Sequence, residues 1–148
     1  MLICPFEVPP EADAQFLAQW PGGAKLHRAL RSDVEFRFVA VGDAAVADIP
    51  FPSHPALYKV VHEEGDVDGH GGTVLINPLD ARADTRDTFA GQPGFLGTRL
   101  YRAVEAATEF RFVEIARWSS PLMFARATKK TTYPGRPALY EVVPASPK

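Results

Sequence analysis

The residue in this sequence best suited to chemistry is a carboxylate in an apolar stretch. Glu114 lies in the segment 110–118, which reads FRFVEIARW. Alternate residues of an extended strand point to opposite faces, so Glu114 shares one face with aromatic side chains. A lone carboxylate in such surroundings is unusual. Glu114 could therefore be a general base that moves a proton, or an ionised residue at the rim of a sheet.

The histidines and the single cysteine give weaker signals. His62, Asp66, Asp68 and His70 are close in sequence, but their spacing matches no zinc motif, so we expect a solvated loop there and no metal site. Cys4 is expected to be a small buried side chain. One cysteine cannot form an internal disulfide, which fits a reducing compartment. No motif for a nucleotide cofactor or an acyl-enzyme nucleophile is present.

The elements around Glu114 belong to an internal repeat. Residues 26–29 (LHRA) match 100–103 (LYRA), and the pentapeptide EFRFV occurs at both 35–39 and 109–113. Both matches have the same offset of 74 residues. Two separate blocks in the same order are poorly explained by chance, so we interpret the chain as two diverged copies of one unit.

A third match sets the limits of the copies. Residues 51–61 match residues 133–143 with an offset of 82, so the second copy carries eight additional residues before its last strand. The segment between the copies is rich in Gly and Asp, which is the composition of a linker. We predict a first ferredoxin-like unit over 1–64, a linker over 65–72 and a second unit over 73–148.

Each copy is predicted to follow the order β-α-β-β-(α)-β. The first copy has strands over 2–6, 25–30, 35–41 and 56–62, with a helix from about 9 to 20 and at most one helical turn over 44–47. The second copy has strands over 73–77, 97–103, 110–117 and 138–143, with helices over 83–90 and 121–129. Its last helix is expected to face inward through Leu122, Phe124 and Ala125.

Both faces of the strand over 110–117 are apolar, and each needs a cover. Val113 and Ile115 suit packing under helices. The other face is aromatic and carries Phe110, Phe112 and Trp118. Exposed to water, it would form a large apolar patch. Phe36 and Phe38 occupy the matching alternate positions in the first copy. We predict an α+β fold in which two tandem ferredoxin-like units form an intramolecular α+β barrel, with the two sheets face to face and the helices outside.

Composition argues against several partners. The 148 residues carry a net charge of −2, and 46% of them are hydrophobic, as in a globular protein. No basic patch suggests nucleic acid, and no apolar run approaches a membrane span. The start of the chain does not read as a signal peptide, so we expect a cytoplasmic protein. Exposed edge strands could pair one copy of the chain with another, so a homodimer is kept as an alternative to a monomer.

Three segments resemble the antibiotic biosynthesis monooxygenase family. They are 93–103, 110–118 and 136–143, and residues 4–9 look like the family's opening strand and helix start. Family members are usually single ferredoxin-like units that dimerise into a barrel, which a tandem fusion would build within one chain. The resemblance implies oxidation of an aromatic polyketide-like phenol or anthrone to a quinone in antibiotic biosynthesis. O2 is the co-substrate, and no metal or flavin is needed.

The resemblance places the site in the second copy. Asn77 matches the family's first-strand asparagine and Trp118 its tryptophan after the third strand, while Glu114 replaces a second asparagine. The first copy has Cys4, Ala44 and Ala40 at these positions. The implied catalytic residues are therefore Asn77, Trp118 and Glu114. The implied substrate-binding residues are Phe36, Phe38, Phe110, Phe112, Arg136 and His54.

Several of these assignments keep a structural alternative. Asn77 precedes Pro78, and Asn-Pro is a common turn former. Trp118 could pack in the core rather than stack on a substrate. His54 and Arg136 could lie on the surface. The whole protein could instead be a polyketide cyclase or isomerase that uses Glu114 without O2, or a non-catalytic protein that binds a small ligand.

Overall fold

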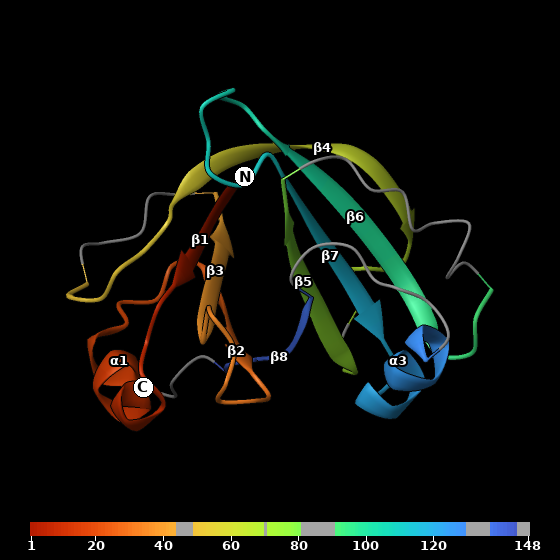
Figure 1. The fold of residues 1–148 in the computed structure, drawn as a ribbon, viewed down its shortest axis with the longest axis horizontal. Coiled ribbons are helices and arrows are strands. Elements are labelled where there is room, and N and C mark those ends of the chain that lie inside the picture. The colour runs from red at the N-terminus through yellow and green to blue at the C-terminus, as the bar shows by residue number, and fades with distance from the viewer. Residues whose placement is uncertain (44–48, 70, 81–90, 130–136, 145–148) are drawn as a thin grey trace. The chain divides into compact units, whose positions relative to one another are not determined.

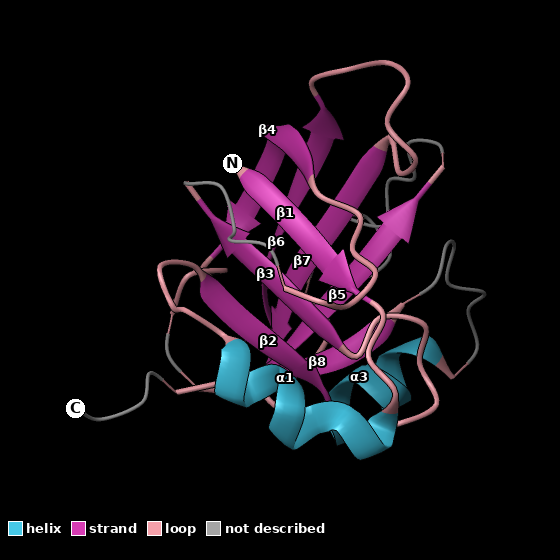
Figure 2. Cartoon of the chain, turned by 90° about the vertical axis from the view of Figure 1, so that its left-hand side faces the viewer, coloured by secondary structure: helices cyan, strands magenta, loops and turns pink. Residues whose placement is uncertain are grey.

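The computed structural model describes residues 1–43, 49–69, 71–80, 91–129 and 137–144 (Figure 1). Strands account for most of its regular structure (Figure 2). The predicted helix over 83–90 and the turn over 44–47 lie outside the described residues. None of the described helices is long and apolar enough to span a membrane. The elements in chain order are β1 (Leu2–Phe6), η1 (Pro10–Ala12), α1 (Asp13–Gln19), β2 (Lys25–Ala29), β3 (Phe38–Gly42), β4 (Ala56–Gly65), β5 (Thr73–Leu79), β6 (Phe95–Ala103), β7 (Phe112–Trp118), α3 (Pro121–Thr128) and β8 (Ala138–Val142).

The chain forms two compact units whose limits cut through two strands. Unit 1 contains Met1–Tyr58 and Tyr140–Lys148, and unit 2 contains Lys59–Leu139. Strand β4 begins in unit 1 and continues into unit 2. Strand β8 begins in unit 2 and ends in unit 1. Each unit therefore includes chain that the sequence repeat assigns to the other copy.

The sheet of unit 1 has the antiparallel strand order of a ferredoxin-like fold, β4-β1-β3-β2. Strand β1 pairs with β3 along its whole length and with β4 through Ile3 and Ala56. The other edge of β2 pairs with β8, where Arg28 is opposite Glu141. Their side chains form an ion pair at 2.6 Å. The α+β class and the ferredoxin-like strand order are thus confirmed for this unit.

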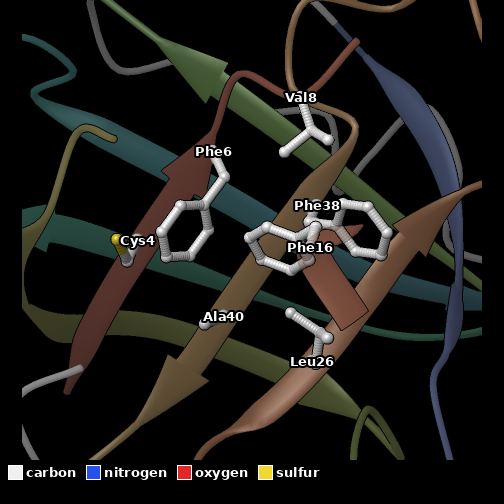
Figure 3. Close-up of a cluster of buried hydrophobic side chains, with 7 residues drawn as sticks. All are labelled: Cys4, Phe6, Val8, Phe16, Leu26, Phe38 and Ala40. Atoms are coloured by element: carbon white, nitrogen blue, oxygen red, sulfur yellow. The ribbon is translucent and has the colours of Figure 1, made fainter. Parts of the chain in front are cut away.

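Helix α1 covers this sheet through Phe16, which is fully buried. The ring of Phe16 stacks on Phe38 with centroids 4.3 Å apart and meets Phe6 edge-on at 5.1 Å (Figure 3). Pro10 opens the preceding turn, where its fixed φ is well tolerated. Arg37 donates to both carboxylate oxygens of Asp13, which ties α1 to the start of β3. Aromatic packing and one bidentate ion pair therefore fix the helix.

Unit 2 repeats the register of unit 1. Asn77 of β5 is the Cα partner of Glu114 in β7, as Cys4 of β1 is of Ala40 in β3. Leu100 of β6 is opposite Glu114, as Leu26 of β2 is opposite Ala40. Leu100 and Glu114 lie 74 positions after Leu26 and Ala40, as the offset read from the sequence predicts, and Asn77 lies 73 positions after Cys4. The repeat therefore extends from residue types to the alignment of hydrogen-bonded strands.

The face that α3 covers differs from the prediction. Buried Leu75, Ala116 and Trp118 form a cluster with Met123, Phe124 and Ala127 of α3. Helix α3 therefore lies over the aromatic face of β7, and not over the face of Val113 and Ile115. The prediction was wrong because both faces are apolar, so strand parity could not show which of them receives a helix. In unit 1, α1 likewise packs on the face of Phe38.

The inward side of α3 also differs by about one position. Phe124 faces the sheet as expected, but its companions are Met123 and Ala127. Leu122 is 58% exposed, and Ala125 is also exposed. Ser120 sets the start of the helix, because its hydroxyl accepts a hydrogen bond from the Met123 amide at 3.2 Å. Pro121 occupies the first turn, as is usual for proline.

Acidic side chains of the predicted linker pair with arginines on the sheet of unit 2. Strand β4 extends to Gly65, and the chain then passes along β6 and β7. Arg99 donates to Asp68 at 2.6 Å, and Arg117 to Asp66 at 3.2 Å. The hydrogen bonds that Arg99 donates to the carboxylates of Asp68 and Glu63 hold the pKa of Arg99 above its ordinary value. Asp66 and Asp68 thus have cationic partners, and among the described residues no three potential ligands gather around a metal site.

Candidate functional site

Asn77 and Glu114 face each other across neighbouring strands of unit 2. Asn77 is fully buried and Glu114 is 6% exposed. Cα partners in an antiparallel sheet point to the same face, so the amide and the carboxylate lie on one surface. Asn77 lies inside β5, so the turn interpretation is wrong. The burial of Glu114 likewise excludes a position on the solvent-exposed rim.

A third polar residue, which the sequence analysis did not identify, completes this group. The hydroxyl of Thr98 donates to Oε2 of Glu114 at 3.2 Å. Thr98 lies on β6 opposite Ala116, the next residue of β7 on the Glu114 face. It is 5% exposed. The sequence contained a signal for it, because the residue 74 positions earlier is Ala24.

Trp118 lies on the same face but two rows further along β7. It is four positions along the strand from Glu114, which corresponds to about 13 Å. Its ring meets Phe95 and Phe124 edge-on, with centroids 5.3 and 5.5 Å apart. These contacts place Trp118 in the core beneath α3. Of the phenylalanines predicted near it, Phe110 is buried and Phe112 is half-buried.

The remaining predicted site residues belong to unit 1, and one is outside the described chain. Phe38 is part of the core under α1. The Phe36 ring contacts the His54 ring at 5.3 Å, and Nε2 of His54 is 2.8 Å from a carboxylate oxygen of Glu7. These contacts are internal to unit 1. Arg136 lies outside the described residues.

Unit 1 has no polar counterpart of the Asn77–Glu114 pair. Cys4 and Ala40 occupy the equivalent positions and lie in the hydrophobic cluster around Phe16 (Figure 3). Burial raises the pKa of the Cys4 thiol to about 11, although hydrogen bonds involving Ser53 and the His54 backbone act in the opposite direction. A thiol with this pKa is protonated at neutral pH and is a poor nucleophile. Among these equivalent positions, groups suited to proton transfer are therefore found only in unit 2.

A pocket of about 210 Å³ lies beside α3. Met123 and Ala127 contribute its apolar wall, and these two residues also pack against the cluster around Trp118. Arg126 is its charged side chain, and Gln92 and Pro93 complete the lining. The pocket shares no lining residue with the Asn77, Thr98 and Glu114 group.

The group formed by Asn77, Thr98 and Glu114 combines three chemical abilities. The carboxylate can accept a proton, the amide can donate a hydrogen bond to an oxygen, and the hydroxyl can orient the carboxylate. All three side chains are almost completely buried, where polar interactions are stronger than in water. This arrangement is suited to removing a proton from an acidic carbon or phenol and stabilising the resulting anion.

Neither a protein-family model nor a curated protein matches the sequence. Solved structures do. A ferredoxin-fold protein from Listeria monocytogenes related to antibiotic biosynthesis monooxygenases is 15% identical with a TM-score of 0.52, and the match covers 99% of this chain and 96% of that one. An anthrone oxidase-like protein is 12% identical with a TM-score of 0.55, covering 96% and 90%. A major regulator of staphylococcal pathogenesis is 14% identical with a TM-score of 0.54, covering 98% and 99%.

These matches extend over nearly the full length of both chains, and two of the three proteins have names linked to oxidative enzymes. Identity of 12 to 15% establishes a common fold and leaves the activity to the residues of the site. The chain therefore has the ferredoxin fold found in proteins related to antibiotic biosynthesis monooxygenases.

Proposed function

We propose that this protein is a cofactor-independent monooxygenase that oxidises an anthrone or a related phenol to a quinone. The observation that carries the proposal is the buried Asn77–Glu114 pair in unit 2, in a fold shared with an anthrone oxidase-like protein. Anthrones become strong reductants of O2 once they lose a proton. The reaction therefore requires a base, a hydrogen-bond donor to the anion and a site that excludes water.

The reaction balances with O2 as the only co-reactant. Glu114 takes one proton from the methylene carbon of the anthrone and leaves an enolate. The enolate gives electrons to O2, and a C–O bond forms at the same carbon to give a hydroperoxide after protonation. Loss of water from the hydroperoxide gives the quinone. One oxygen atom of O2 enters the new carbonyl group and the other leaves as water.

The side chains have distinct roles in this proposal. Glu114 is the base, and the Asn77 amide donates to the enolate oxygen, where negative charge develops. Trp118 holds α3 against the sheet through Phe124 and so keeps the apolar side of the site closed. Phe112, which shares the Glu114 face of β7, and Phe110, which precedes the strand, would contact the flat rings of the substrate.

Oxygen uptake with a defined anthrone tests the proposal. Purified protein is incubated with 1,8-dihydroxyanthrone in air and under argon, without added metal or flavin, and quinone absorbance and O2 consumption are recorded. We expect quinone and O2 consumption in a ratio of one to one, above the rate without protein. Absence of any enhancement with this anthrone and with a panel of naphthols would contradict the proposal.

A second candidate function is favoured by the same carboxylate. Glu114 accepts a hydrogen bond from Thr98 and could move a proton in a polyketide cyclase or isomerase, a reaction that consumes no O2. The two functions differ in one readout. Product formation that proceeds equally under argon would identify the cyclase or isomerase.

A further inference from the structure

We infer that Thr98 is a positioning residue for Glu114, holding the carboxylate in the orientation from which it takes a proton from the substrate. The inference rests on the proposed function, because it assigns Thr98 a part in the same proton transfer. The direct observation is the hydrogen bond from the Thr98 hydroxyl to Oε2 of Glu114 at 3.2 Å.

The position of Thr98 makes this contact specific. Thr98 is opposite Ala116, and Glu114 is the next residue of β7 on that face, so the hydroxyl reaches the carboxylate along a diagonal of the sheet. Threonine is branched at Cβ and has few χ1 rotamers, so the strand fixes where its oxygen lies. A carboxylate that accepts from such a donor is held more firmly than one that contacts apolar neighbours alone.

Burial makes the hydrogen bond between Thr98 and Glu114 energetically important. Thr98 is 5% exposed and Glu114 is 6% exposed. A buried carboxylate costs free energy unless it is hydrogen-bonded, so loss of the hydroxyl would affect Glu114 more than loss of a contact in water. The neighbour of Thr98 across the strands is the methyl group of Ala116, which offers the carboxylate no hydrogen bond.

The repeat within the chain supports a joint role for the polar residues. At the positions of Asn77, Thr98 and Glu114, unit 1 has Cys4, Ala24 and Ala40. All three belong to or pack against the hydrophobic cluster of that unit. The hydroxyl, the amide and the carboxylate are therefore present together in one unit and replaced together in the other. This is the pattern expected if Thr98 serves Glu114 rather than the strand.

Steady-state kinetics with 1,8-dihydroxyanthrone test the inference in four proteins: the unmodified chain, Thr98→Val, Thr98→Ser and the control Thr73→Val. Thr73 is a buried threonine of the same unit, opposite Trp118 rather than Glu114. We expect Thr98→Val to lower kcat roughly tenfold or more with KM changed less than about twofold, because a misplaced base slows chemistry and not binding. Thr98→Ser restores kcat, and Thr73→Val leaves it unchanged.

Equal losses in Thr98→Val and Thr98→Ser, or full kcat in Thr98→Val, would overturn the inference. A measurement that needs no turnover separates it from the proposed function. The protein is labelled with carbon-13 at the side-chain carboxyl groups of glutamate and studied by NMR. The resonance of Glu114 is assigned as the one that is absent from the spectrum of Glu114→Gln. We expect this resonance to move in Thr98→Val and to return in Thr98→Ser. If it moves while the unmodified chain is inert towards all anthrones and naphthols, the proposed function fails and the positioning of Glu114 stands; if it does not move, the inference fails.

Discussion

Asn77 of β5 and Glu114 of β7 are Cα partners, and the pair in the same register of unit 1 is Cys4 and Ala40. One unit therefore places an amide and a carboxylate where the other places a thiol and a methyl group. In unit 1 these positions are packed against the Phe16 cluster. The two units differ in their capacity for proton transfer at a matched position of a common sheet.

The first prediction concerns the carboxylate. Glu114→Gln keeps the size of the side chain and removes its ability to accept a proton. We expect the rate of quinone formation from 1,8-dihydroxyanthrone to fall by roughly 10²- to 10⁴-fold. Stopped-flow absorbance measures the rate. Glu105→Gln, at an exposed glutamate of the same unit, is the matched control and should retain full activity. Comparable turnover in both variants would show that Glu114 is not the base.

The second prediction concerns the equivalent position in unit 1. Ala40→Glu places a carboxylate among Cys4, Phe16 and Phe38, in a cluster of apolar side chains. We expect a loss of about 3–5 kcal/mol in the free energy of unfolding, because a buried charge without a partner is strongly destabilising. Urea titration followed by tryptophan fluorescence measures it. Val104→Glu, at a position that is 58% exposed, should change stability by less than about 0.5 kcal/mol. A well-tolerated Ala40→Glu would mean that unit 1 can accommodate a polar site.

The third prediction concerns pH. His27 is buried, and its Nδ1 donates to the Val39 carbonyl oxygen at 3.1 Å. Burial lowers the pKa of His27 from 6.5 to about 4 in the folded chain. As the pH falls below 6.5, the unfolded chain therefore takes up the proton first, so the contribution of His27 to stability is present above pH 6.5 and is lost towards pH 4. The loss is expected to reach about 3 kcal/mol.

Urea titrations between pH 4 and pH 8 test this dependence. His27→Gln should flatten the curve of unfolding free energy against pH within that window. His54→Gln is the comparison, because His54 is partly exposed and pairs with Glu7. Parallel curves for the unmodified chain and His27→Gln would show that another group is responsible for the acid sensitivity.

The fourth prediction concerns the thiol of Cys4. Its pKa of about 11 and its burial both suppress the reactive thiolate. We expect the native protein to react with 5,5′-dithiobis(2-nitrobenzoate) at pH 8 at least about 100-fold more slowly than the same protein in 6 M guanidinium chloride. Absorbance of the released thionitrobenzoate gives both rates. Stoichiometric labelling of the native protein at the unfolded rate would show that β1 opens readily.

The repeat allowed much of the fold to be predicted from one sequence. Matching blocks fixed the order of strands, and the structure shows the same register for Cys4 with Ala40 as for Asn77 with Glu114. Element ends were less accurate: β3 begins at Phe38 rather than at residue 35, and β4 continues to Gly65, into the predicted linker. Strand ends depend on which neighbour supplies hydrogen bonds, and that information is not local.

The site was predicted in part. Glu114 was identified because a carboxylate is rare on an apolar strand face. Its burial depends on the packing of the assembled sheet and could be seen only in the structure. Thr98 was missed because a threonine is an ordinary strand residue, and only its distance to Glu114 reveals the contact. The face covered by α3 could not be deduced, since Phe112 and Val113 are both apolar and the choice depends on tertiary packing.

Unit 1 includes residues 140–142, which pair with β2 more than 100 positions earlier in the chain. Tyr140 also donates to the Phe36 carbonyl oxygen at 2.7 Å across 104 positions. A ribosome therefore synthesises all of unit 2 before unit 1 can acquire its last strand. The edge of β2 that pairs with β8 must stay unpaired during that interval. At a synthesis rate of about 5–20 residues per second, the interval lasts several seconds or more. We expect the nascent chain to be most prone to aggregation, and most dependent on chaperones, while β2 waits for its partner.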